Sequence, residues 1–154
     1  MLIPRIYLET TIFNFYFDKT NNLAHKSTLA LFDMIADDKY LAFTSSAVIE
    51  ELASAPIDKY KKMIKLVDDY KITVLTVSGE AEKLADIYVA ENIIPLKYRA
   101  DGVHIAIGTL NNLDLIVSMN FQHIVKLKTK RETSRINIQN GYRAIEISNP
   151  MEVI

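Results

Sequence analysis

Side chains able to bind cations or to donate and accept hydrogen bonds follow several apolar stretches of this chain. They are Glu9, Glu50, Glu51, Asp101, Ser118 and Asn120. If the apolar stretches are parallel strands, their carboxyl ends meet at one edge of a sheet, which is where open α/β sheets bind ligands. The sequence therefore predicts that three carboxylates and one amide converge at this edge.

Carboxylates brought together in this way repel one another, which raises their pKa values. A divalent cation removes that cost, and hard oxygen ligands favour Mg²⁺ or Mn²⁺ over zinc. Such an ion can bind a phosphate oxygen and activate an attacking water. The chemistry predicted for this cluster is the hydrolysis of a phosphodiester.

Most of these acids also have a structural explanation. Asp101 can serve as a helix N-cap, since a carboxylate accepts hydrogen bonds from free N–H groups and favours the helix dipole. Glu50 and Glu51 face about 100° apart on a helix, so one can line a site while the other is solvated. Glu9 is harder to explain in this way, because a carboxylate after a buried strand is costly unless it is paired or liganded.

The smaller polar residues are open to the same choice between structure and chemistry. Asn120 is of a type common in turns, while Thr10 and Ser118 can cap helices or bind the backbone. His104 lies one helical turn after Asp101, beside an apolar stripe. We interpret it as a packed histidine with a local hydrogen bond rather than as a metal ligand.

Strands and helices are predicted to alternate along the chain. Short apolar stretches predict strands at 3–8, 40–44, 71–77, 115–118 and 144–148. Helical spacing of apolar residues predicts helices at 21–38, 47–53, from 58, from 78 and at 101–111, with partly helical structure in 121–140. This alternation predicts right-handed crossovers and a three-layer α/β/α sandwich with a parallel, roughly five-stranded sheet.

Composition and charge are those of an ordinary globular protein. The 154 residues suit one domain spanning 1–154, and the absence of cysteine excludes disulfide scaffolds and thiol nucleophiles. The formal net charge of −1 does not indicate a globally basic nucleic-acid-binding protein. No apolar run approaches the roughly 18 residues of a membrane span, and segment 1–18 lacks a signal-peptide cleavage site. We therefore expect a soluble, cytoplasmic protein without membrane contact.

Other α/β enzyme classes fit the sequence poorly. The four glycines form neither a G-x-G-x-x-G fingerprint nor a P-loop, which argues against a nucleotide-binding protein. A G-x-S-x-G nucleophile elbow is also absent from the sequence. A phosphoacceptor receiver would need an adjacent acidic pair after the first strand, and Glu9 stands alone there.

One stretch after the last acidic motif is strongly basic. It contains Lys126, Lys128, Lys130 and Arg131. Basic residues beside an acidic metal pocket would attract the phosphate backbone of RNA, although a solvated helix face is an equal alternative. The lysines at 59, 61, 62 and 65 we interpret as solvent-exposed, and the aromatic residues of 13–17 as core or subunit interface.

Four segments resemble the successive motifs of a PIN domain. They are Ile-Tyr-Leu-Glu-Thr-Thr-Ile (6–12), Ser-Ser-Ala-Val-Ile-Glu-Glu-Leu (45–52), Arg-Ala-Asp-Gly-Val-His-Ile-Ala-Ile-Gly (99–108) and Leu-Ile-Val-Ser-Met-Asn-Phe-Gln-His-Ile (115–124). Their order and spacing match over nearly the whole chain. The resemblance is to small stand-alone PIN proteins of the VapC toxin type.

The resemblance implies a five-stranded parallel sheet between helices and an Mg²⁺- or Mn²⁺-dependent ribonuclease activity. It places the family's three acids at Glu9, Glu51 and Asp101, and its fourth position at Asn120. Thr10 or Ser118 would supply the hydroxyl that orients water or a ligand. In relatives, an apolar groove accepts an antitoxin helix or a second copy, so RNA, an antitoxin protein and a homodimer are the partners implied.

Two positions depart from the family pattern. Glu9 is one methylene longer than the usual aspartate, and Asn120 removes one negative charge. Together they favour a single metal ion, a weaker metal affinity or, in the extreme, a lost activity. Our interpretation is an active metal-dependent ribonuclease, with the role of a toxin in a toxin–antitoxin pair left open. The alternative is a catalytically weakened or inactive PIN-like module that binds RNA or a protein partner.

Overall fold

The computed structural model describes residues 2–154, and a parallel sheet forms its centre. The strands of this sheet are β1 (Arg5–Leu8), β2 (Leu41–Ser45), β3 (Thr73–Leu75), β4 (Leu115–Val117) and β5 (Glu146–Ser148). Their order is β3-β2-β1-β4-β5, and each neighbouring pair is parallel. Within residues 2–154, the predicted five-stranded parallel sheet is confirmed.

The strand order reverses at the centre of the sheet. The chain runs outward from β1 through β2 to β3, and then returns to place β4 on the other side of β1. Leu8 pairs with Val117, so Glu9 and Ser118 leave the sheet side by side. Ligands of open α/β sheets bind where the order reverses, at the carboxyl ends of the strands.

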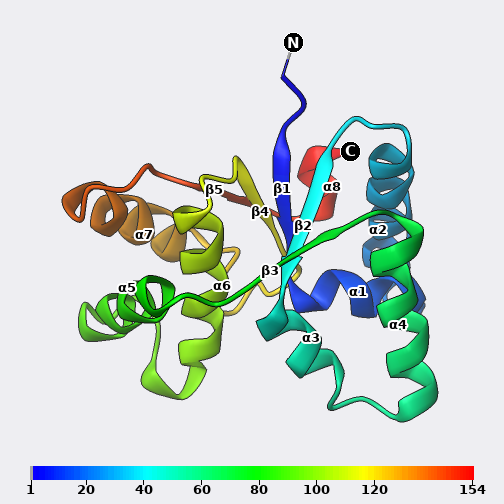
Figure 1. The fold of residues 1–154 in the computed structure, drawn as a ribbon, viewed down its shortest axis with the longest axis horizontal. Coiled ribbons are helices and arrows are strands. Elements are labelled where there is room, and N and C mark those ends of the chain that lie inside the picture. The colour runs from blue at the N-terminus through cyan, green and yellow to red at the C-terminus, as the bar shows by residue number, and fades with distance from the viewer. Residues whose placement is uncertain (1) are drawn as a thin grey trace.

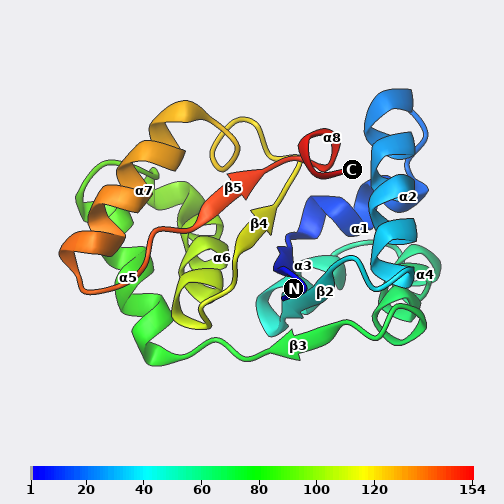
Figure 2. The same ribbon diagram turned by 90° about the horizontal axis from the view of Figure 1, so that it is seen from above.

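Helices cover both faces of the sheet (Figure 1; Figure 2). On one face lie α5 (Gly79–Ala90), α6 (Arg99–Leu110) and α7 (Leu127–Gln139). On the other face lie α1 (Thr10–Phe17), α2 (Asn22–Ala36), α4 (Ile57–Asp69) and α8 (Pro150–Val153). The short α3 (Ser46–Leu52) follows β2 directly, and the 3₁₀ turn η1 (Leu96–Tyr98) precedes α6. The predicted layering is therefore confirmed.

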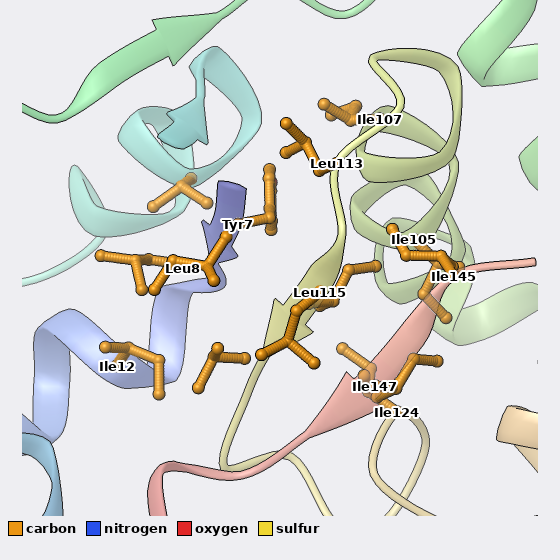
Figure 3. Close-up of a cluster of buried hydrophobic side chains, with 14 of the residues drawn as sticks. Tyr7, Leu8, Ile12, Ile105, Ile107, Leu113, Leu115, Ile124, Ile145 and Ile147 are labelled. Atoms are coloured by element: carbon orange, nitrogen blue, oxygen red, sulfur yellow. The ribbon is translucent and has the colours of Figure 1, made fainter. Parts of the chain in front are cut away.

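Buried aliphatic side chains join the central strands to α6. Leu115 of β4, Ile147 of β5 and Ile105 of α6 all belong to this cluster (Figure 3). α6 approaches the sheet closely at Gly108, where an added Cβ would stand 2.9 Å from Ile145 Cδ1 and 3.2 Å from Ile116 Cγ1. Because even a methyl group does not fit there, the glycine sets how close the helix lies to the strands.

The aromatic residues after β1 pack between α1 and α2 and against the core. Phe13 is fully buried, and Tyr16 packs edge-on against Phe32 with ring centroids 4.9 Å apart. Tyr16 and Phe17 also pack against the core. The interpretation of the aromatic residues as core is confirmed for Phe13, Tyr16 and Phe17.

Two helices were absent from the prediction. α1 begins with three β-branched residues and continues with mostly aromatic ones, which are weak helix formers. α8 has only four residues, although Asn149 and Glu152 form a capping box around it. The predicted strands at 71–77 and 144–148 are also shorter, at three residues each. No helix within residues 2–154 has the length and apolar character needed to cross a bilayer.

Candidate active site

Glu9 is buried, with 3% of its surface exposed, where β1 ends. Its backbone N–H donates to the carbonyl of Val117 at 3.1 Å, which ties it to β4. Its Oε1 accepts hydrogen bonds from the Thr11 hydroxyl and the Ser118 hydroxyl, each at 2.6 Å, and from the Thr11 N–H at 3.3 Å. Glu9 is thus the N-cap of α1, and within residues 2–154 no hydrogen bond occupies its Oε2.

Glu51 reaches the same edge of the sheet from α3. This helix starts directly after β2 because the Ser45 side chain accepts a hydrogen bond from the Val48 N–H and caps it. Thr10 donates its hydroxyl proton to Glu51 Oε2 at 2.5 Å. Glu50 is exposed, so the two neighbours do divide between site and solvent.

His104 is fully buried and connects α6 to β1 and α3. Its Nε2 lies 2.7 Å from Glu51 Oε1, and its Nδ1 lies 2.6 Å from the Tyr7 hydroxyl. The Tyr7 hydroxyl is in turn 2.7 Å from the hydroxyl of Ser45. The prediction of a packed histidine is correct, but the local hydrogen bond is wrong, because both partners are distant in the sequence.

The pair formed by Glu51 and His104 changes the pKa of both groups. Burial raises the pKa of Glu51, but the hydrogen bond and charge of His104, with help from Thr10, bring it below its usual value. Burial lowers the pKa of His104, but Glu51, assisted by Glu9 and Asp101, holds it above its usual value. At pH values between the two folded pKa values, the pair therefore consists of a carboxylate facing a protonated imidazole.

Asp101 lies in the first turn of α6, two positions after Arg99, where the helix begins. The N-cap is Tyr98, so the interpretation of Asp101 as an N-cap is wrong. Burial and the negative charge of Glu9 raise the pKa of Asp101, while His104 and other neighbours oppose the rise. The repulsion from Glu9 indicates that the two carboxylates share one environment.

Ligand atoms of Glu9, Glu51 and His104 lie within 4.8 Å of one another. Two oxygens on one Mg²⁺ are at most about 4.2 Å apart, given bonds of about 2.1 Å, so small side-chain movements would let Glu9 and Glu51 share an ion. Both nitrogens of His104 already have partners, which makes it a positioning residue for Glu51. Asp101 is outside this group within residues 2–154. Two carboxylates, with a third nearby, fit the hard oxygen ligands that Mg²⁺ and Mn²⁺ prefer.

A solved structure has the same arrangement of strands and helices. It is that of VapBC2 from Rickettsia felis, bound to a DNA fragment from their promoter, with a TM-score of 0.59 and 12% sequence identity. The match covers 94% of this chain and 98% of that chain. The two share a fold. No protein-family model and no curated protein matches the sequence, so the similarity supports a PIN-like fold and establishes nothing finer.

The loop after β4 adds two polar residues to the surroundings of the carboxylate cluster. Ser118 is buried, donates to Glu9, and accepts a hydrogen bond from the Asn120 N–H at 2.9 Å. The Asn120 Oδ1 accepts from the His123 N–H at 3.0 Å, as in a turn. The side-chain oxygen of Asn120 is therefore turned to the backbone of the loop.

The predicted RNA-binding residues lie at the start of α7. Lys126, Lys128 and Arg131 are exposed, and Lys128 donates to the carbonyl of Asn92 at 3.0 Å. Lys130 is half-buried, and its Nζ lies 4.0 Å from Glu152. Among the described residues, none of these four forms a salt bridge with the carboxylate cluster. Their contact with RNA stays a prediction.

Sequence reasoning missed Tyr7 and Thr11. Tyr7 places a hydroxyl inside an otherwise apolar strand, and a buried tyrosine hydroxyl usually has a hydrogen-bond partner. Thr11 follows Glu9 by two residues, the spacing of a side chain that bonds to a capping residue. Both signals were present in the sequence, but neither identifies the partner.

Proposed function

We propose that this protein is an Mg²⁺- or Mn²⁺-dependent ribonuclease that hydrolyses RNA phosphodiester bonds. The observation that carries the proposal is the approach of Glu9 and Glu51, whose ligand atoms lie within 4.8 Å of each other where the strand order reverses. These residues are far apart in the sequence, and a second carboxylate beside the buried Glu9 is costly unless positive charge compensates the pair. The PIN-like fold supports the same activity.

Glu9 and Glu51 would hold the metal ion, with Asp101 completing its surroundings. A divalent ion there supplies positive charge to the phosphodiester and favours ionisation of the attacking water. The protein's own groups keep the carboxylates in place. Thr11 and Ser118 fix one oxygen of Glu9, whereas His104 and Thr10 hold the two oxygens of Glu51.

The glutamate at position 9 is compatible with this activity. Its longer side chain allows Oε1 to cap α1 and to accept from Ser118, while Oε2 stays free of hydrogen bonds within residues 2–154. One carboxylate therefore combines a structural role with a ligand role. The extra methylene group is consistent with a single metal ion held by fewer charges than in a site with four acids.

The role of a toxin in a toxin–antitoxin pair belongs to the same proposal. The fold shared with VapBC2 supports it, and the protein partner would then be an antitoxin. The basic residues Lys126, Lys128, Lys130 and Arg131 would contact the RNA backbone through charge. A homodimer also stays a prediction.

A second candidate function is that of an inactive PIN-like module that binds RNA or a protein. The orientation of Asn120 favours it, because the side-chain oxygen faces the His123 N–H and is not offered to a metal ion. Only the carboxylates of Glu9, Glu51 and Asp101 would then be left to bind a metal ion. This candidate predicts binding without cleavage.

Cleavage of a mixed panel of single-stranded RNAs in Mn²⁺ separates the two functions. We expect the wild type to cut at least one RNA, and the variants Glu51→Gln and Asp101→Asn to lose at least about 100-fold in rate, the scale on which single catalytic groups act. EDTA should abolish cleavage. If the wild type and both variants are equally inert while RNA or a partner still binds, the inactive module is the correct function.

A further inference from the structure

Lys59 lies in a hollow beside the carboxylate cluster. The hollow has a volume of about 250 Å³, and its walls include Thr10 and Asn14 of α1, Glu51 of α3 and Lys59 of α4. Glu51 thus belongs both to the carboxylate cluster and to the wall of this hollow. The predicted solvent-exposed face is confirmed for Lys61, Lys62 and Lys65 but not for Lys59, whose side chain is half-buried here.

The ammonium group of Lys59 is held by a neutral partner. Its Nζ donates to Asn14 Oδ1 at 2.6 Å. Among residues 2–154, Lys59 takes part in no salt bridge, whereas Lys65 on the same helix pairs with Asp69 at 2.8 Å. An ammonium has three donors, so two remain after the bond to Asn14. The ammonium is therefore fixed in place without a direct ion pair among residues 2–154, and its charge is strong enough to help lower the pKa of the exposed Asp18.

One face of α1 links this lysine to the carboxylate cluster. Thr10 donates to Glu51, and Asn14, four residues later on the same face, accepts from Lys59. Four residues correspond to about 6 Å along the helix axis. A ligand in the hollow would therefore lie within one helical turn of the residues that we propose hold the metal ion.

A second hollow next to Glu51 is less suited to an anion. It has a volume of about 590 Å³ and contains Arg99, but also Glu50 and Glu82. The Arg99 Nε donates to Asp86 Oδ1 at 2.6 Å, so its charge is already paired. Of the two hollows that share Glu51, the one with Lys59 has the cation that forms no salt bridge among residues 2–154.

We propose that Lys59, anchored by Asn14, is a phosphate subsite that binds an RNA backbone phosphate next to the one being cleaved. This inference rests on the proposed ribonuclease function. A pocket of carboxylates repels a polyanion, and a fixed ammonium at its border offsets this repulsion and sets the position of the strand. Lysine is suited to this role because it binds phosphate as a point charge. The RNA would then pass between α1 and α4, where the sequence gave no reason to place it.

Binding of a fluorescent single-stranded RNA in EDTA tests the subsite without catalysis. We expect Lys59→Gln to weaken binding about five- to tenfold at low salt, and to reduce the slope of log affinity against log salt by about 0.7, the contribution of one phosphate contact. Lys59→Arg should recover most of the affinity. Asn14→Ala should weaken binding less, because the lysine stays but is no longer anchored.

Lys62→Gln is the matched control, since Lys62 is an exposed lysine on the same helix. Its substitution changes the net charge by the same amount as Lys59→Gln. We expect its effect to be below twofold. If Lys59→Gln and Lys62→Gln weaken RNA binding equally, the proposal of a subsite at Lys59 is wrong, even when the wild type cleaves RNA. If the wild type neither binds nor cleaves RNA, the subsite and the proposed function are both wrong. A loss of folding would be visible in the thermal unfolding of each variant.

Discussion

The imidazole Nε2 of His104 lies 2.7 Å from Oε1 of Glu51, which joins two residues 53 positions apart in the sequence. The histidine is fully buried, while about a third of the glutamate side chain is exposed toward the site. This contact fixes one oxygen of Glu51 from the interior of the protein. The other oxygen is held by Thr10, so the orientation of the carboxylate does not depend on a bound ion.

The variant His104→Gln should change stability most in mildly acidic solution. The folded pKa of Glu51 is below the usual 4.5, so its contribution is present above pH 4.5 and is lost as the pH falls through the folded value. The folded pKa of His104 is above the usual 6.5, so its contribution is present below pH 6.5 and is lost as the pH rises through the folded value. The contribution of the pair to the free energy of unfolding is therefore greatest between pH 4.5 and pH 6.5, where both contributions are present.

Urea unfolding of the wild type and His104→Gln, in EDTA at a series of pH values, measures this contribution. We expect a difference in the free energy of unfolding of about 1–3 kcal/mol near pH 5–6, with a smaller difference at pH 9 and at pH 3. His25→Gln is a control, because the His25 imidazole contacts the backbone carbonyl of Phe15. A difference that does not vary with pH would show that the pair is not charged in the folded protein.

Asp101→Asn should stabilise the metal-free protein while removing activity. Burial and the charge of Glu9 raise the pKa of Asp101. At neutral pH the ionised carboxylate is therefore less stable in the folded protein than in the unfolded chain. The neutral amide removes this repulsion. We expect a gain of about 0.5 kcal/mol, since the partial exposure of Asp101 screens the effect, and a rise in Tm of about 1–2 °C. Thermal unfolding in EDTA at pH 7 measures it, and a lower Tm would contradict the repulsion.

The same substitution should reverse its effect when Mn²⁺ is present. Mn²⁺ stabilises a folded state that binds it, by an amount that grows with concentration relative to its dissociation constant. We expect saturating Mn²⁺ to raise the Tm of the wild type more than that of Asp101→Asn. Equal shifts for the two proteins would place Asp101 outside the metal surroundings.

The regular elements were largely predictable because each depends on nearby residues. The alternating apolar strands and amphipathic helices gave the parallel sheet, and Ser45 and Ser78 cap their helices as local sequence predicts. α1 was missed because its aromatic residues favour a strand, while packing of Phe13 and Tyr16 against α2 stabilises a helix. Tertiary packing there outweighs local preference.

The contacts within the site could not be predicted from local patterns. His104 has an ordinary place beside an apolar stripe, and its two partners become neighbours only when β1 and α3 are assembled. The orientation of Asn120 depends on the His123 N–H in the folded loop. Lys59 differs from the exposed Lys62 because Asn14 faces it from another helix. Residue types indicated which groups could do chemistry, and long-range packing decided which of them meet.

Tyr7→Phe should weaken the support of Glu51 without altering any residue that would hold the metal. Burial raises the pKa of Tyr7, so its hydroxyl stays protonated and can bond to His104 Nδ1 and Ser45. Removing the hydroxyl leaves buried polar atoms of His104 and Ser45 without this partner, which costs about 1–3 kcal/mol of stability. The ¹⁵N chemical shifts of the His104 imidazole should also change, because the hydrogen bond at Nδ1 is lost.

The activity of Tyr7→Phe distinguishes positioning from simple destabilisation. We expect kcat in Mn²⁺ to fall about tenfold at a temperature where the variant is fully folded. The change in KM should be smaller, since Tyr7 is fully buried and out of reach of RNA. Thr44→Val is a suitable control, because it also removes a buried hydroxyl next to the site, one that donates to the Leu8 carbonyl instead of to the histidine. Equal losses in the two variants would mean that the hydroxyl of Tyr7 has only a structural role.

Glu9→Asp introduces the residue that is usual at this position in the PIN proteins that the sequence resembles. It should separate the two roles of the Glu9 carboxylate, capping α1 and binding the metal ion. Aspartate is a good N-cap, so the free energy of unfolding should change by less than about 1 kcal/mol. The side chain is one methylene shorter, and it cannot both accept from Thr11 and Ser118 and approach Glu51 as Glu9 does. We expect Mn²⁺ affinity to fall about tenfold by isothermal titration calorimetry, while Glu9→Gln should lose still more because the charge is gone. If Glu9→Asp binds Mn²⁺ more tightly than the wild type, the length of the glutamate does not help to hold the ion.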